Sequence, residues 1–290
     1  MKNFSLNCAL LALFLIVSLT SVINAQKMAA QEIIAKHLDS IGTKEKRGEL
    51  KNRFLFADVH LVIKGTPTRI GGKGLVLSEG EKSLWGMNLN SNDYPQDRFG
   101  FDGKNTKVGF SKPGVRSTLG GFIYSYPELL DESLLGGGLL SSWALLNPIV
   151  KNAKISVDGT KKIEGQETYV LSYMPKGGSD LSIKMFFDQK NFRHLRTEYS
   201  RVIAARQGGG IDNSAGQSSD RYRLIENFSD FEDMGGLMLP KIYKISYNQT
   251  GSGSIQLAAN ANREMEWTFK ITNFAYNQKT DNTTFDIPTN

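Results

Sequence analysis

The sequence predicts an α+β fold in which one large antiparallel β-sheet of about ten or eleven strands packs against a few helices. Long stretches of the chain alternate apolar and polar residues with a period of two, which is typical of strands with one buried face. Residues 129–146 are strongly apolar without that alternation, so they predict helices for the buried face of the sheet. No linker rich in proline or serine divides the chain, and we expect one domain over residues 26–290.

Residues 1–25 are interpreted as a secretory signal peptide. Lys2 precedes an apolar run over residues 8–17, and Ala25 is a small residue of the kind found at cleavage sites. An uncleaved membrane anchor is the alternative, because residues 6–23 are about as long as a spanning helix. Cleavage after Ala25 would remove Cys8, the only cysteine, so the mature protein would have no disulfide and no thiolate chemistry.

The first element of the predicted domain is an amphipathic helix over residues 28–41. Ile34, Leu38 and Ile41 fall on one helical face, and Gly42 follows where a helix commonly stops. From Arg53 the pattern changes to strand alternation. Turns rich in glycine or proline then separate further predicted strands at residues 74–78, 82–89, 98–101 and 106–110, an order that favours an antiparallel meander.

The middle of the chain predicts two short helices with a flexible joint. Gly136, Gly137 and Gly138 interrupt the apolar residues 129–146 and prevent one long helix. Two interpretations remain open at this point: the helices are ordinary buried core, or they form a mobile lid with the three glycines as its hinge.

The C-terminal half returns to strands, and the last of them shows the alternation most clearly. Met265, Trp267 and Phe269 share one face of this strand with Ile271, whereas Glu264, Glu266, Thr268 and Lys270 share the other, as in a sheet with one solvated side. The predicted strands cover residues 168–174, 181–188, 192–202, 222–231, 237–247 and 264–276, and a polar loop rich in glycine at 207–219 interrupts the series.

Charge and motif content argue against several classes of function. The chain carries 35 Lys and Arg against 29 Asp and Glu, a net charge of +6, and its basic residues are spread rather than clustered, so we expect no nucleic-acid binding. The three histidines, His37, His60 and His194, lack metal-ligand spacing, and no nucleophile motif is present. We therefore expect no metal, no cofactor and no enzymatic activity.

Short motifs in the chain resemble the LolA/LolB superfamily of periplasmic lipoprotein carriers, especially its outer-membrane lipoprotein-sorting-like branch. They include Asp-Gly pairs at 102–103 and 158–159, the closing Phe285-Asp286, and the stretches 165–175, 187–188, 193–199, 226–231, 235–240 and 273–274. The motifs also suit turns, since Asp-Gly favours hairpins and Pro240 cannot donate to a strand ladder. The resemblance implies an incomplete β-barrel whose concave face is covered by helices and holds acyl chains.

This resemblance also implies a function, a location and a partner class. We expect a secreted, non-enzymatic carrier or binding protein, located in the periplasm of a Gram-negative-type bacterium, that transports or holds the acyl part of a lipid or lipoprotein near the outer membrane. The alternative is a periplasmic interaction or sensor module of the same fold that binds a protein partner, such as a membrane protein. We expect a monomer.

The apolar surface for such a ligand is predicted from two segments. The interrupted helices would face the last long strand, with Gly136, Gly137 and Gly138 as the hinge that lets them lift. The predicted lining and lid residues are Leu134, Leu135, Leu139, Leu140, Trp143, Met265, Trp267 and Phe269. The alternative is that these residues pack directly on one another as ordinary core.

Overall fold

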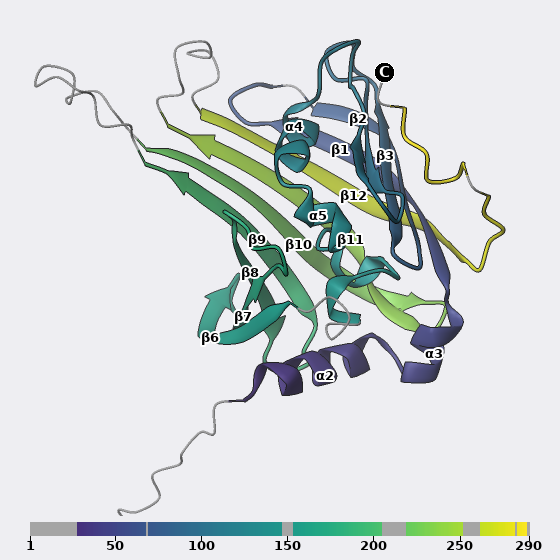
Figure 1. Cartoon of the computed structure of the whole chain (residues 1–290), viewed down its shortest axis with the longest axis vertical. Coiled ribbons are helices and arrows are strands. Elements are labelled where there is room, and N and C mark those ends of the chain that lie inside the picture. The colour runs from purple at the N-terminus through teal and green to yellow at the C-terminus, as the bar shows by residue number, and fades with distance from the viewer. Residues whose placement is uncertain are drawn as a thin grey trace, which may run out of the picture.

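A computed structural model describes residues 28–67, 69–146, 153–204, 219–251, 262–281 and 283–288. The predicted signal peptide and residues 207–218 of the predicted loop lie outside these described residues. The described chain is organised around one twelve-stranded antiparallel sheet (Figure 1). Its strands are β1 (Asn52–Ile63), β2 (Arg69–Glu79), β3 (Lys82–Leu89), β4 (Gln96–Phe101), β5 (Thr106–Val108), β6 (Lys154–Ile163), β7 (Gln166–Met174), β8 (Ser182–Asp188), β9 (His194–Ile203), β10 (Asp220–Met234), β11 (Leu237–Thr250) and β12 (Asn262–Tyr276).

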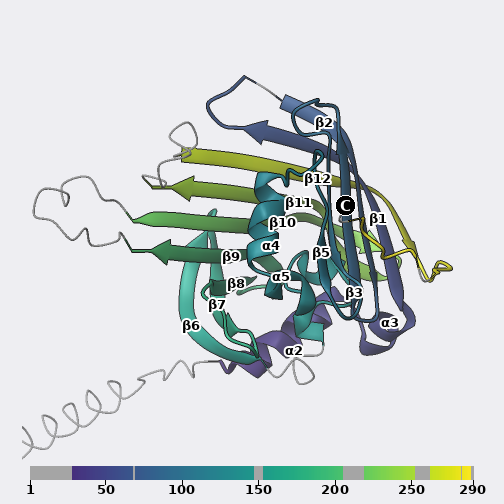
Figure 2. The same ribbon diagram turned by 45° about the horizontal axis from the view of Figure 1, so that its top comes forward.

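The strand order sets the path of the chain. From edge to edge the order is β5-β4-β3-β2-β1-β12-β11-β10-β9-β8-β7-β6. Strands β5 and β6 are consecutive in the chain, yet they form opposite edges of the sheet. The connection between them must therefore pass from one edge to the other, and its described helices lie inside the curve of the sheet (Figure 2).

Side chains alternate between the two faces of the sheet, as a period of two requires. In β12, Met265, Trp267 and Phe269 are buried in the main core, whereas Lys270 is exposed. The apolar residues of the inner, concave face share this core with the connection between β5 and β6. One face of the sheet is therefore covered by protein and the other is largely solvated.

Four α-helices are described. Helix α2 (Ala30–Ile41) buries Ile33, Ile34 and Ile41, and it ends where Gly42 donates its N–H to the carbonyl of Leu38. Helix α3 (Lys44–Glu49) follows directly. Helices α4 (Thr118–Ser125) and α5 (Glu128–Asp131) belong to the connection between β5 and β6, which also contains the 3₁₀ turns η1 (Gly137–Leu139) and η2 (Ala144–Leu146).

The predicted fold class is confirmed: a large curved antiparallel sheet carries its helices on the concave face. The sheet has twelve strands instead of ten or eleven because the sequence analysis missed β6. This edge strand is mostly exposed, and its apolar alternation is limited to Ile155 and Val157, which are only half-buried. Asp158 and Gly159, predicted as a hairpin turn, lie inside β6 at a bulge where Gly159 has φ +109°.

Two further expectations need correction. Pro240, expected to end a strand ladder, lies within β11, where it pairs with Phe231 of β10. In place of the two short helices predicted in residues 129–146, the structure has most of the four-residue helix α5 and the two 3₁₀ turns η1 and η2. The left-handed residues Ser133 (φ 53°), Gly136 (φ 81°) and Gly137 (φ 51°) keep this segment from continuing as an α-helix.

The outer, convex face carries a small core of its own near β2 and β3. Phe285 and Ile287 from the C-terminal segment pack there against Leu77 and Leu84. Asp286 between them lies 3.6 Å from the ammonium of Lys107. The C-terminal segment therefore stabilises the face of the sheet that the helices leave uncovered.

Candidate functional site

The concave face is covered by residues 129–146, which we call the insert. Its predicted lining residues, Leu134, Leu135, Leu139, Leu140 and Trp143, are each at most 1 % exposed. The predicted strand residues Met265, Trp267 and Phe269 of β12 belong to the same continuous core. In the described structure both sets are thus in one packed interior, with side chains filling the space between the insert and the sheet.

Polar side chains on the sheet hold the backbone of the insert. Glu226 of β10 accepts a hydrogen bond from the Gly136 N–H at 2.6 Å, and Tyr199 of β9 donates to the Leu134 carbonyl at 3.0 Å. At the other side of the face, the guanidinium of Arg53 in β1 donates to the Gly138 carbonyl at 2.5 Å. These three bonds satisfy polar backbone groups of an insert that forms no strand ladder with the sheet.

Glu226 is the centre of this polar cluster and is fully buried. Besides Gly136, its carboxylate accepts hydrogen bonds from the hydroxyls of Tyr243 at 2.5 Å and Tyr199 at 2.7 Å, so Tyr199 shares its one hydroxyl proton between Glu226 and the more distant Leu134 carbonyl. Burial raises the pKa of Glu226 from 4.5 to about 7, and the three donated hydrogen bonds oppose that rise. Burial and the neighbouring carboxylate also raise the pKa values of Tyr199 and Tyr243, so both phenols stay protonated and act as donors.

Arg53 is a second buried charge beneath the insert. Its side chain is 1 % exposed, and burial lowers its pKa from 12.5 to about 10. Within the described part of the chain, no carboxylate lies within ion-pair distance of this guanidinium, and its Nε lacks a hydrogen-bond partner. The Gly138 carbonyl of the insert therefore carries much of the compensation for burying this cation.

The predicted hinge glycines occupy tightly packed positions. A methyl group on Gly136 would come within 2.6 Å of the Trp85 ring, and one on Gly137 within 2.8 Å of the His194 ring. Gly138 is less confined, with Ile41 of α2 at 3.2 Å. Glycine is required at the first two positions both for the positive φ and for the close approach of the insert to the sheet.

An aromatic cluster packs beneath the second half of the insert. Trp143 stacks on His194 of β9 at a centroid distance of 5.1 Å and meets His37 of α2 edge-on at 5.2 Å. Burial lowers the pKa of His37 from 6.5 to about 4 and that of His194 well below 6.5. Both imidazoles are therefore neutral at physiological pH, which suits an apolar setting.

A pocket of about 530 Å³ opens at the end of the concave face near the start of β12. Its apolar wall consists of Ile63, Tyr94, Val115 and Met265. This volume lies within the range of roughly 300–1,000 Å³ that is usual for ligand sites. Met265, a predicted lining residue, thus connects the pocket to the apolar row of Trp267 and Phe269.

A buried carboxylate supports the wall of this pocket of about 530 Å³, which we call the mouth pocket. Asp97 of β4 accepts hydrogen bonds from the hydroxyls of Tyr94 and Ser117, each at 2.5 Å. Ser117 also caps α4, accepting the Gly120 N–H at 2.7 Å. Burial raises the pKa of Asp97 from 3.8 to about 6. The network fixes the position of Tyr94 and of the start of α4 at the pocket.

The rim of the mouth pocket is polar. Lys64 pairs with Glu264, and Lys112 lies 3.2 Å from Asp93. The guanidinium of Arg116 stacks on the exposed Tyr124 ring at 3.9 Å. The pocket thus combines an apolar wall with a charged rim, an arrangement that suits an amphiphile.

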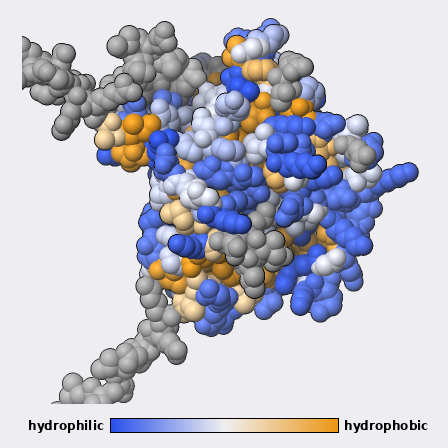
Figure 3. All heavy atoms as spheres, viewed as in Figure 1, coloured by the Kyte–Doolittle hydropathy of each residue, from blue (hydrophilic) through white to orange (hydrophobic). Residues whose placement is uncertain are grey.

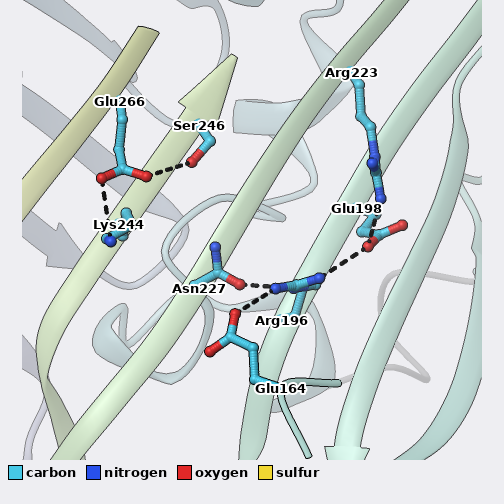
Figure 4. Close-up of polar contacts among 8 residues, drawn as sticks. All are labelled: Glu164, Arg196, Glu198, Arg223, Asn227, Lys244, Ser246 and Glu266. Atoms are coloured by element: carbon cyan, nitrogen blue, oxygen red, sulfur yellow. Dashed lines mark hydrogen bonds and ion pairs between the residues drawn. The ribbon is translucent and has the colours of Figure 1, made fainter. Parts of the chain in front are cut away.

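The convex face presents a different kind of hollow, of about 660 Å³, lined mainly by polar side chains. Arg196 contacts Glu164 at 2.7 Å and Glu198 at 3.4 Å, and Arg223 also contacts Glu198 at 2.8 Å (Figure 4). Lys244 lies 3.1 Å from Glu266 on the neighbouring strands. The charges in this network compensate one another, and the lining of the hollow is mainly polar, so the hollow is no candidate for an apolar ligand.

Hydrophobic surface is divided into patches among hydrophilic side chains in the view of Figure 3. One patch lies at the end of β9, where Val202 is 63 % and Ile203 is 40 % exposed. None of the helices in the described ranges combines the length and the apolar character needed to cross a membrane. The described side chains also include no group of three or more His, Cys, Asp or Glu placed to hold a metal ion.

Sequence reasoning missed the polar half of this site. Glu226 was noted only as part of a predicted strand and of a stretch that carries the family resemblance, and Arg53 only as the start of a strand. The alternation along β10 could have identified Glu226, because Leu224, Glu226 and Phe228 occupy every second position and share the buried face. A carboxylate between two core residues of a strand marks a buried polar group with specific partners.

Comparison with known proteins gives likenesses of fold only. No family model matches the chain, and no curated protein matches it significantly. A LolA superfamily protein from Nitrosomonas europaea is 12 % identical with a TM-score of 0.48, and covers 90 % of this chain and 98 % of its own. A DUF1329 family protein from Desulfovibrio piger is 10 % identical with a TM-score of 0.46, over 88 % of this chain and 96 % of its own.

A domain from Vibrio parahaemolyticus described as outer membrane lipoprotein-sorting is 12 % identical with a TM-score of 0.42, over 87 % of this chain and 97 % of its own. The fold of the chain itself, an open antiparallel sheet with helices inside its curve, agrees with the one that the sequence resemblance implied.

Proposed function

We propose that this protein is a non-enzymatic carrier or binding protein that holds the acyl part of a lipid or lipoprotein on the concave face of its sheet, beneath the insert. The observation that carries the proposal is the mouth pocket. It is open at its charged rim and bounded on the inside by Met265, from which the buried row of Trp267 and Phe269 continues along β12. An acyl chain that enters here and displaces the insert from the sheet would meet an apolar surface along its length.

The energetics favour such a ligand. Burial contributes roughly 0.8 kcal/mol per methylene, so a chain of about fourteen carbons gains on the order of 10 kcal/mol before the loss of freedom on binding is subtracted. A chain that slides between the insert and the sheet keeps both surfaces in contact with hydrocarbon. The leucines of the insert then stay out of water while the ligand is bound.

The insert is suited to movement because it is joined to the sheet by side chains alone. Lifting it would break the bonds to Glu226, Tyr199 and Arg53 and that of the Ser141 N–H to Ser78, without opening a strand ladder. If its first residues move too, the bonds that Glu132 accepts from the Tyr173 hydroxyl and the Lys176 N–H also break. We assign Leu134, Leu135, Leu139, Leu140 and Trp143 to the moving side of the acyl site, and Met265, Trp267 and Phe269 to its fixed side. Gly136, Gly137 and Gly138 are the hinge in this proposal.

Location and processing belong to the same proposal. Residues 1–25 direct secretion and are removed, and residues 26–290 act as one domain in the periplasm. N-terminal sequencing of the protein from a secreting bacterial host should then find Gln26 first. A start at Met1 would contradict the soluble carrier.

Binding of a fluorescent fatty acid, measured together with thermal melting, tests the acyl site. Val115 is 58 % exposed at the mouth pocket, so Val115→Trp should narrow the entrance and weaken binding while the melting temperature stays near that of the wild type. Val202→Glu, at an exposed position remote from the pocket, is the control and should change neither signal.

Charged substitutions beneath the insert distinguish a cavity from solid core. Leu139→Glu and Trp143→Glu should abolish fatty-acid uptake and leave the sheet folded if the insert lifts as proposed. Loss of binding and of the folded state together in both variants, with unchanged binding in Val115→Trp, would refute the acyl site. Mass spectrometry of the purified wild type should detect a co-purified lipid.

A further inference from the structure

The polar floor of the concave face matches a polypeptide backbone, and this match bears on the ligand. The floor holds an acceptor for an N–H, the Glu226 carboxylate, and a donor for a carbonyl, the Arg53 guanidinium. The Tyr199 hydroxyl adds a second donor, whose one proton is shared between Glu226 at 2.7 Å and the insert carbonyl at 3.0 Å. All three side chains are at most 1 % exposed. In the described structure their partners are Gly136, Leu134 and Gly138 of the insert.

An insert that lifts takes these backbone partners with it. A plain hydrocarbon chain in its place would leave Glu226 without the Gly136 N–H and Arg53 without its carbonyl, both still buried. A buried polar group that loses its partner costs free energy, and the cost is larger for a charged group. A ligand that offers only methylenes is therefore a poor substitute for the insert at this point of the floor.

The apolar surroundings set the second requirement on the ligand. Leu134 and Leu135 precede the glycines of the insert, and Leu139 and Leu140 follow them, all buried. The insert thus presents a polar backbone flanked by hydrocarbon. A ligand that replaces it in full carries an amide N–H and carbonyl next to an alkyl chain.

We infer that Glu226, together with Tyr199 and Arg53, is a specificity-determining site that recognises the amide of an amide-linked amphiphile, such as an N-acylated peptide. The insert occupies the same site in the ligand-free protein and mimics that amide. This inference rests on the proposed function, since it concerns the polar end of a ligand whose acyl chain lies along β12.

Two probes that differ in a single N–H test the inference. N-Myristoylglycinamide carries the amide, and the corresponding ester, O-myristoyl glycolamide, replaces its acyl-linked N–H by oxygen. Binding is followed by the fluorescence of the buried tryptophans at pH 8, above the raised pKa of Glu226 of about 7, so that the carboxylate is ionised. The wild type should bind the amide roughly 10- to 100-fold more tightly than the ester, as expected for a hydrogen bond to a charged acceptor.

The variants assign that preference to Glu226. Glu226→Leu should bind the two probes equally, and Glu226→Gln, whose side-chain carbonyl still accepts an N–H, should keep a preference of a few-fold. The control is Tyr247→Phe, which removes a hydroxyl on the same face of the sheet that donates to Gln249 at 3.2 Å. It should keep the full preference of the wild type.

The outcomes separate this inference from the proposed function. Equal binding of the two probes by the wild type, or a preference that persists in both Glu226 variants, would overturn the amide site while leaving the acyl site intact. Failure of both probes and of a fluorescent fatty acid to bind would overturn both. Binding of the unacylated peptide Leu-Leu-Gly-Gly-Gly-Leu, the sequence of residues 134–139, as tightly as the acylated probe would replace the amphiphile by a protein partner.

Discussion

The unfolding free energy of Glu226→Gln, relative to that of the wild type, should rise as the pH rises from acidic to alkaline. Burial raises the pKa of this carboxyl from 4.5 to about 7, so the folded state holds the proton more tightly than the unfolded chain does. Its contribution to stability is complete below pH 4.5 and is lost as the pH rises to about 7. At 1.36 kcal/mol per pKa unit the loss is about 3.4 kcal/mol, of which about 2.5 kcal/mol develops between pH 5 and pH 8.

Buried histidines impose the opposite dependence on the wild type. The pKa of His37 is lowered to about 4, so the folded state loses stability as the pH falls from 6.5 towards 4, and His194 acts in the same direction. The pH profile of the wild type alone therefore mixes the two effects. The difference in unfolding free energy between Glu226→Gln and the wild type cancels the histidines and isolates the carboxyl.

Urea unfolding at pH 5, 6, 7 and 8, followed by the fluorescence of the buried tryptophans, measures that difference. We expect the unfolding free energy of Glu226→Gln, relative to the wild type, to rise by about 2.5 kcal/mol from pH 5 to pH 8. Asp97→Asn is the control, because the pKa of Asp97 is raised only to about 6 and its difference should level off near pH 7. If the unfolding free energies of Glu226→Gln and the wild type change in parallel with pH, the raised pKa of the buried Glu226 carboxyl is refuted.

Two further variants test the packing of the insert and of the mouth pocket by the same unfolding assay. Gly136→Ala should lower the unfolding free energy by about 3 kcal/mol, because the left-handed backbone and the contact with Trp85 both disfavour a side chain. Gly65 has the same φ of 81° with open space around it, so Gly65→Ala should lower it by only about 1 kcal/mol. Equal losses would contradict the tight approach of the insert to the sheet. Ser117→Ala removes the cap of α4 and a hydrogen bond to Asp97, and should cost about 1–3 kcal/mol, against less than about 0.5 kcal/mol for the exposed Ser125→Ala at the other end of the helix.

Local sequence patterns were sufficient to predict most of the sheet. Strand β12 could be located because Met265, Trp267 and Phe269 alternate with polar residues. The helix predicted over residues 28–41 is α2, which begins two residues later, at Ala30. These elements have one apolar and one polar face, so their period is visible in the sequence. Strand β6 has little apolar character because it lies at an edge, and its pattern resembled a turn.

The polar floor could not be predicted in this way because its contacts are distant in sequence. Gly136 and Glu226 are 90 residues apart, and Arg53 and Gly138 are 85 apart. The sequence pattern indicates only that a charged side chain occupies an inward-facing position of a strand. Which backbone group satisfies it depends on how the insert crosses the sheet, and that follows from the strand order.

The position of β5 and β6 at opposite edges has a mechanical consequence. The chain between Val108 and Lys154 joins the two edges, and its described helices and turns lie inside the curve of the sheet (Figure 2). If the sheet keeps its curvature, only the middle of this connection can move away from it. If the sheet flattens, its two edges move apart and the connection must extend. If the protein takes up a ligand as proposed, uptake and the curvature of the sheet are coupled through this one covalent connection. A crosslink that shortens the connection should then hold the sheet curved and the concave face closed.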